Sequence, residues 1–119
     1  MGDFRRLDVW QRARGLSLEV YLATRSMPRS ELFGLTSQLR RSAISIAANI
    51  AEGCGRNTDP ELRRFLRIAL GSAAELECLL WLAADAGYVV PAEAFRLANE
   101  AARLCRMLAT LIRKLPDNR

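Results

Sequence analysis

The stretch that decides the fold runs from Gly34 to Arg56 and reads Gly34-Leu-Thr-Ser-Gln-Leu-Arg-Arg-Ser-Ala-Ile-Ser-Ile-Ala-Ala-Asn-Ile-Ala-Glu-Gly-Cys-Gly-Arg56. Its apolar residues recur at spacings of four and three, which places them on one face of a helix. These residues are Leu35, Leu39, Ala43, Ile46 and Ile50. Gly53 and Gly55 are expected to end the helix, because glycine adopts the left-handed conformation at low cost. The stretch therefore predicts a helix over about residues 35–52.

A second stripe on this helix is polar and contains Ser42, Ser45, Asn49 and Glu52. The many alanines around it indicate close contact with neighbours on more than one side. We expect Asn49 and Glu52 to be buried polar residues that hydrogen-bond across helices or subunits. Such residues fix the register of packed helices, and we prefer this structural role to a ligand site.

Three further segments carry the same helical spacing, over about residues 7–26, 59–86 and 91–115. Thr58 and Glu61 form a capping box at the start of the third helix, and Pro91 suits the first position of the fourth. Phe33, in a short turn before the second helix, is expected to point into the core. No segment has the alternation of a strand. The chain is predicted to be one all-α domain, residues 1–119, folded as an antiparallel up-down-up-down four-helix bundle.

The third predicted helix has more apolar surface than one bundle seam requires. One stripe runs from Leu62 to Ala83, and a second contains Leu66, Leu70, Ala73 and Leu80, with Ile68 and Trp81 beside it. This surplus predicts a subunit interface, because a monomer would otherwise expose a large apolar patch. The alternative is a central helix buried on several sides.

The residue types argue against catalysis. The chain contains no histidine, the commonest general base near neutral pH and the commonest metal ligand. Cys54, Cys78 and Cys105 are too far apart in sequence for a C-x-x-C zinc or redox motif. Only Cys54, near Arg56 and a helix end, resembles the setting of a reactive thiol. We expect no enzyme activity, no catalytic residues, no cofactor and no metal site.

The N-terminal residues lack the apolar core of a signal peptide, and the longest apolar run is far shorter than the ~20 residues that span a bilayer. A cytoplasmic location without membrane contact is therefore expected. The formal net charge is +5, which is compatible with a polyanionic partner. The alternative is that this charge serves only to keep the protein soluble.

Several motifs together resemble a known family: Leu7-Asp-Val-Trp-Gln11 after Phe4, Gly34-Leu-Thr-Ser-Gln-Leu-Arg-Arg-Ser-Ala43, Asn49-Ile-Ala-Glu-Gly53, Phe65-Leu-Arg-Ile-Ala-Leu-Gly-Ser72 and Gly87-Tyr88. The chain is similar to the four-helix bundle proteins named after intervening sequences of 23S ribosomal RNA genes. Accessory variability proteins of retroelements are distant relatives of that group. The resemblance implies a ring-shaped homo-oligomer, typically a pentamer, and basic surfaces suited to RNA or DNA. One departure is Ala47, which stands where the family usually has proline.

Two functional hypotheses follow. In the first, the protein binds the RNA or DNA backbone through arginines near the start of the third helix and along the second, aided by helix N-terminal amides. The candidate nucleic-acid-binding residues are Arg40, Arg41, Arg56, Arg63, Arg64 and Arg67. The competing interpretation pairs these arginines with nearby glutamates, among them Glu52 and Glu61. In the second hypothesis the protein is an interaction scaffold, or an accessory subunit of a partner enzyme such as a reverse transcriptase, and binds no nucleic acid.

Overall fold

Four long helices make up most of residues 2–116, the part of the chain that the computed structural model describes. They are α1 (Asp8–Ala23), α2 (Leu35–Cys54), α3 (Asp59–Asp85) and α4 (Pro91–Lys114), with two short 3-10 helices, η1 (Phe4–Arg6) and η2 (Arg29–Glu31). None of the described residues forms a strand, so the all-α prediction is confirmed. The predicted domain, residues 1–119, includes Met1 and residues 117–119, which lie outside the described residues.

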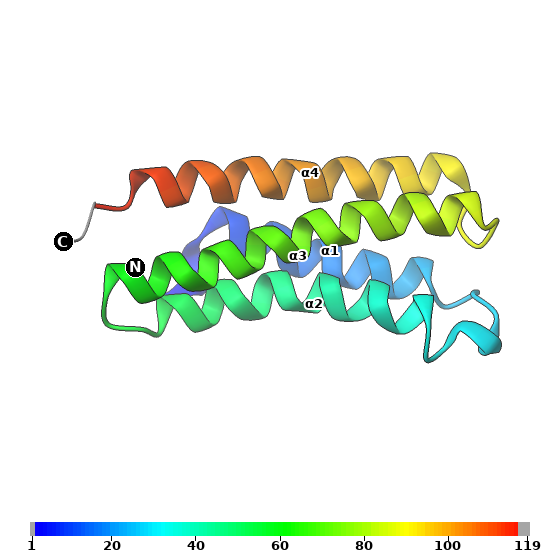
Figure 1. The fold of residues 1–119 in the computed structure, drawn as a ribbon, viewed down its shortest axis with the longest axis horizontal. Helices are drawn as coiled ribbons and strands as arrows, with labels where there is room; N and C mark the ends of the chain where they lie inside the picture. The colour runs from blue at the N-terminus through cyan, green and yellow to red at the C-terminus, as the bar shows by residue number, and fades with distance from the viewer. Residues whose placement is uncertain (1, 117–119) are drawn as a thin grey trace.

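The helices lie side by side along one axis, and the fold measures 48 × 23 × 21 Å. Figure 1 shows the α2–α3 connection at one end, and the α1–α2 and α3–α4 connections at the other. Each helix packs against two others, because contacts join α1 to α2, α2 to α3, α3 to α4, and α4 back to α1. The face formed by α1 and α2 therefore lies opposite the face formed by α3 and α4.

The helix ends follow their local chemistry. Thr58 caps α3 as predicted, since its hydroxyl accepts a hydrogen bond from the Glu61 backbone N–H at 3.4 Å. Helix α1 ends at Ala23, earlier than the predicted residue 26, and the Arg25 backbone N–H bonds to the Leu22 carbonyl three residues back, so the i−4 pattern stops there. Gly87, between α3 and α4, has a φ of +80°, a backbone conformation that favours glycine.

Gly53 corrects one expectation. It lies inside α2, which continues to Cys54, and its φ is not positive. A Cβ at this position would lie 3.0 Å from the Cβ of Phe65 and 3.1 Å from a methyl carbon of Leu62. The glycine is therefore required for the close approach of α3, and not as the left-handed residue that ends the helix.

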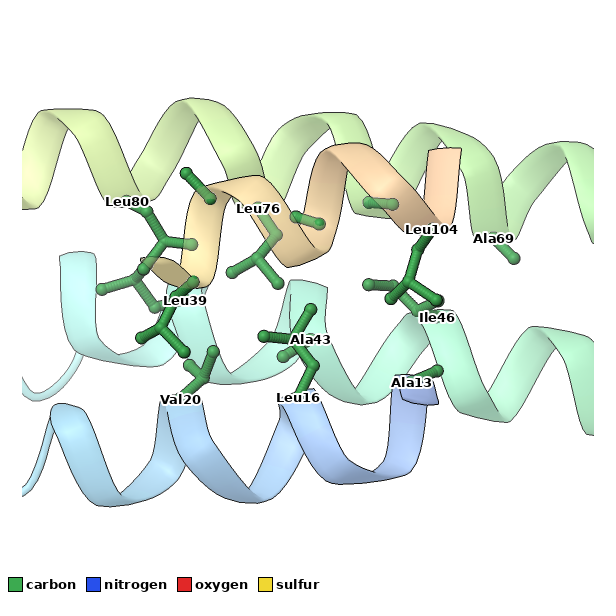
Figure 2. Close-up of a cluster of buried hydrophobic side chains, with 14 of the residues drawn as sticks. Ala13, Leu16, Val20, Leu39, Ala43, Ile46, Ala69, Leu76, Leu80 and Leu104 are labelled. Atoms are coloured by element: carbon green, nitrogen blue, oxygen red, sulfur yellow. The ribbon is translucent and has the colours of Figure 1, made fainter. Parts of the chain in front are cut away.

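The core forms where the four apolar faces meet, and Figure 2 shows Leu16, Ile46, Leu76 and Leu104, one from each helix, among its side chains. Both predicted stripes of α3 contribute to it: Leu66, Ala73 and Leu80 are as buried as the first stripe, because α3 packs against both α2 and α4. The width of these stripes is thus explained within one chain and is no evidence for a subunit interface. At the margin of the stripes, Trp81 keeps 41% of its surface exposed.

The expected burial of Phe33 is wrong, because this side chain is 93% exposed. The preceding turn is held instead by Glu31, whose carboxylate accepts hydrogen bonds from the Leu35 backbone N–H at 3.3 Å and from the Tyr88 hydroxyl at 3.4 Å. With the glutamate facing the helices, the phenyl ring points into solvent. In the described part of the chain, no helix combines the length and the hydropathy that crossing a membrane requires.

Candidate nucleic-acid interface

Arginines gather where α2 ends and α3 begins. The guanidinium of Arg56, just after α2, lies 4.9 Å from the centre of the Phe65 ring, and that of Arg64 lies 4.4 Å from the same centre. Phe65 is buried, so its ring is held in a fixed position against both cations. Each cation is attracted to the π-electrons of this ring. Arg63 and Arg67 lie on the same first turns of α3. We call Arg56, Arg63, Arg64 and Arg67 the corner cluster.

Two members of the corner cluster have carboxylate partners. Arg56 pairs with Glu52 at 2.9 Å, and Arg64 pairs with Glu61 at 3.3 Å. For these two arginines, the competing interpretation of the sequence, which pairs them with nearby glutamates, is confirmed. Both pairs are solvent-exposed, however, and exposed ion pairs contribute only about 0–1 kcal/mol. A phosphate group can replace such a carboxylate at small cost.

The other two members lack a carboxylate partner within residues 2–116. Arg63 donates to the Pro116 carbonyl at 2.6 Å, and Arg67 is exposed on α3. The backbone N–H groups at the start of α3 are a poorer anion site than the sequence indicated. Thr58 caps one of them, and Asp59 and Glu61 already occupy the first turn, where their charge opposes an anion. The side chains of the corner cluster are therefore better placed than the helix N-terminus to donate to a phosphate.

Arg40 and Arg41 lie far from the corner cluster, roughly 20 Å back along α2 at 1.5 Å per residue. The Nε of Arg40 donates to the Thr24 hydroxyl oxygen at 2.9 Å, and its guanidinium lies 4.3 Å from the centre of the Tyr21 ring. Arg41 is exposed and lines a groove of about 310 Å³ between α2 and α3. The six predicted arginines therefore form no single surface.

The polar stripe of α2 is arranged differently from the prediction. Glu52 is 51% exposed, so it is not buried between the helices of one chain, and its burial against a second subunit stays a prediction. Asn49 is half-buried, and its amide donates to the backbone carbonyl and the hydroxyl of Ser45, within its own helix. The contact that crosses from α2 to α3 is between the hydroxyl oxygens of Ser45 and Ser72, 2.8 Å apart. Their sequence positions carry no signal that these two hydroxyls meet.

A family model of the 23S rRNA-intervening sequence protein matches residues 5–110 of the chain. The chain belongs to this family. Among solved structures, it is similar to a protein of unknown function from the S23 ribosomal protein family of Bacteroides thetaiotaomicron VPI-5482. That likeness has a TM-score of 0.80 at 23% identity, covers 89% of this chain and 99% of the other, and supports the fold alone. No curated protein matches the chain.

Two of the three cysteines of this member of the 23S rRNA-intervening sequence protein family are poorly suited to act as nucleophiles. Burial raises the pKa of the Cys54 thiol, so the group whose setting seemed most reactive stays protonated near neutral pH. Burial also raises the pKa of Cys105, and the negative charge of Glu77 adds to the effect. Cys78 is exposed on α3. Within residues 2–116, no three or more Cys, Asp or Glu side chains are grouped to hold a metal ion.

Proposed function

We propose that this member of the 23S rRNA-intervening sequence protein family is a non-enzymatic, cytoplasmic nucleic-acid-binding protein. Its antiparallel up-down-up-down bundle assembles into a ring-shaped homo-oligomer, with a pentamer favoured by the family resemblance. Each subunit contacts the RNA or DNA backbone through the corner cluster. One observation carries the binding proposal: two guanidiniums stack on the single buried ring of Phe65, beside the exposed Arg67, which has no carboxylate partner within residues 2–116.

The mode of binding follows from the donors. Arginine binds phosphate oxygens through two parallel N–H bonds and reads no base sequence in doing so. Affinity is then strongly salt-dependent and weakly sequence-specific. A ring multiplies one modest patch several-fold, so that weak contacts add up to stable binding on a long strand.

The assembly proposal is supported by exposed apolar side chains on two opposite faces. Leu18, Tyr21 and Ile44 are exposed on the α1–α2 face, where a groove of about 540 Å³ runs between the two helices. Trp81 and Phe95 pack edge to face on the α3–α4 face with ring centres 5.9 Å apart. Two different surfaces on opposite sides of one subunit are what head-to-tail contacts in a ring require. A second copy of the chain is thus the proposed occupant of both surfaces.

The binding proposal is tested by the doubly substituted variant Arg64→Ser/Arg67→Ser. Its control is Arg103→Ser/Arg106→Ser, which removes the same charge from exposed positions on α4. The probe is a fluorescent single-stranded RNA without a terminal phosphate, titrated at several salt concentrations. For single strands the slope of log affinity against log salt changes by about 0.7 per phosphate contact, so the corner variant should lose about 1.4. Equal losses of slope in the two variants would show that RNA responds to the total positive charge and not to the corner cluster.

The second candidate function is an interaction scaffold, or an accessory subunit for a partner enzyme such as a reverse transcriptase, without nucleic-acid binding. The apolar α1–α2 groove is the observation that favours it, because its lining contributes little to the recognition of phosphate. Light scattering during the RNA titration separates the two candidates. An oligomer that takes up RNA at low salt and releases it at high salt supports the first, and an oligomer indifferent to RNA supports the second.

A further inference from the structure

A small pocket lies at the end of the fold opposite the corner cluster, where the segment between α1 and α2 folds back on both helices. It has a volume of about 240 Å³. Three arginines line it: Arg25 from the segment just after α1, Arg29 from η2 and Arg40 from α2. We call it the loop-end pocket. Arg25 and Arg29 were not among the predicted site residues, because they lie in a connecting segment.

Arg40 is held in this pocket by contacts that leave most of its donors free. Its Nε donates to the hydroxyl oxygen of Thr24, which is only 2% exposed and whose own proton is donated to the Val20 carbonyl at 2.8 Å. The ring of Tyr21 supports the guanidinium from one side. The two Nη nitrogens make no hydrogen bond or ion pair with any residue in the described part of the chain. Arg40 is thus a positioned cation with a free pair of donors.

A hydroxyl adds to these donors. Thr36 is 3% exposed, and its hydroxyl bonds to the sulfur of Met27 at 3.6 Å. A thioether sulfur is a weak acceptor, so an oxyanion in the pocket offers this hydroxyl a stronger partner. The pocket therefore combines charged donors with a buried neutral one.

No carboxylate balances the pocket. None of its lining residues is acidic, and none of its three arginines takes part in an ion pair within residues 2–116. The nearby Glu31 has both carboxylate oxygens engaged, one with the Leu35 backbone N–H and one with the Tyr88 hydroxyl. Three like charges around a small concave surface create a positive potential, most of which an anion of charge near −2 would offset.

We propose that the loop-end pocket binds the dianion of a phosphate monoester. Such a group carries a charge of about −1.5 to −2 at neutral pH and three strong acceptor oxygens, which match the free Arg40 donors, the two exposed arginines and the Thr36 hydroxyl. The same chemistry occurs at the 5′-phosphate end of a nucleic-acid strand and in small phosphorylated metabolites. The pocket shares no residue with the corner cluster, so this inference stands or falls independently of backbone binding there.

The experiment follows the Nε–Hε NMR signals of arginine-labelled protein during titration with phenyl phosphate. Saturable shifts of Arg40, larger than those of Arg103 and Arg106, are expected. The variant Arg25→Ser/Arg29→Ser changes only exposed side chains and should weaken binding about tenfold or more, since charge-assisted hydrogen bonds are lost. Arg103→Ser/Arg106→Ser is the control of equal charge and should change affinity less than about twofold, because its residues lie outside the pocket.

The source of the phosphate is distinguished by two further probes, a short RNA with a 5′-phosphate and the same RNA with a 5′-hydroxyl. Tighter binding of the phosphorylated RNA than of phenyl phosphate, lost in Arg25→Ser/Arg29→Ser, assigns the pocket to strand ends. Equal binding of the two RNAs, with phenyl phosphate still bound, assigns it to small phosphate esters. Arg40 signals that do not shift with phenyl phosphate would overturn the proposal, as would equal losses in the pocket and control variants.

Discussion

The two ends of α2 hold arginines in opposite ways. At its C-terminal end, Arg56 and its neighbour Arg64 stack on Phe65, and each is paired with an exposed glutamate. Toward its N-terminal end, Arg40 stacks on Tyr21 but is bonded to the neutral hydroxyl of Thr24. An exposed carboxylate lowers the local positive charge and competes with a ligand, whereas a buried hydroxyl fixes a guanidinium and leaves its charge uncompensated.

The two proposals together give one chain two different kinds of anion site. The corner cluster lies on an open surface, where Arg56 and Arg64 would exchange their glutamates for the phosphates of a strand. The loop-end pocket is small and concave, and it suits one discrete phosphate group. Substitutions that disturb one end of α2 test whether the other end responds.

The largest effect is expected from Gly53→Val, which forces α2 and α3 apart at the corner. A Cβ at this position would lie within 3.1 Å of Phe65 and Leu62. The Cβ and two methyl groups of valine should therefore lower the free energy of unfolding by about 1–3 kcal/mol. Urea denaturation measures this loss. Gly71→Ala is the control: a Cβ there meets nothing within 4 Å, so the better helix propensity of alanine should raise stability by up to about 1 kcal/mol. Equal stability of Gly53→Val and the unsubstituted protein would contradict the role given to Gly53.

The second effect concerns the aromatic supports. Phe65→Leu keeps an apolar side chain in the core but removes the ring that two guanidiniums contact. Each of these cation–π contacts contributes about 0.5–1 kcal/mol at an exposed site. We expect a stability loss of about 1–2 kcal/mol and a several-fold loss of RNA affinity, measured by urea denaturation and fluorescence anisotropy. Tyr21→Leu removes the support of Arg40 alone. It should weaken phenyl phosphate binding. Because Tyr21 also lines the α1–α2 groove, light scattering must first show an unchanged oligomer, and at equal oligomer size the affinity for unphosphorylated RNA should not change.

The third effect concerns the contact between α2 and α3 midway between the two ends of α2. Ser45→Ala removes the hydroxyl that bonds to Ser72 across α2 and α3 and that also accepts from the Asn49 amide. The Asn49 amide keeps its bond to the Ser45 carbonyl, and each hydrogen bond lost should lower stability by about 0.5–1.5 kcal/mol. Urea denaturation of Ser45→Ala and of the exposed control Ser30→Ala provides the comparison. Both anion sites should keep their affinities, because this contact lies between them. A larger loss at either site would show that the two ends of α2 are coupled.

The sequence was sufficient to predict the elements of the fold. Apolar spacings of three and four located all four helices, and the capping box at Thr58 located the start of α3. These signals are local, since each depends on residues within one or two turns. Stripe width was not sufficient to tell a central helix from an interface helix. That distinction depends on how many neighbours α3 has, which is a property of the whole fold.

The candidate sites were predictable only in part. The grouping of Arg56, Arg63, Arg64 and Arg67 followed from their closeness in sequence. The convergence of Arg25, Arg29 and Arg40 did not, because it depends on the path of the α1–α2 connection. The same connection turned Phe33 outward and Glu31 inward. Periodicity also cannot distinguish a polar residue in the contact between two helices from one beside that contact. For this reason the sequence predicts burial for Glu52, which is exposed in one chain.

The smallest and most specific test neutralises a competing carboxylate. Glu52→Gln removes the charge that faces Arg56 at 2.9 Å and keeps the size of the side chain. If RNA must displace this carboxylate, affinity at low salt should rise about two- to fivefold, because an exposed pair of this kind is worth no more than about 1 kcal/mol. Fluorescence anisotropy with unphosphorylated RNA measures the gain. Glu75→Gln, which removes a charge from an exposed position of α3, is the control for net charge. Equal gains in the two variants would mean that RNA responds to total charge, and the contrast between the two ends of α2 would then lose its functional meaning.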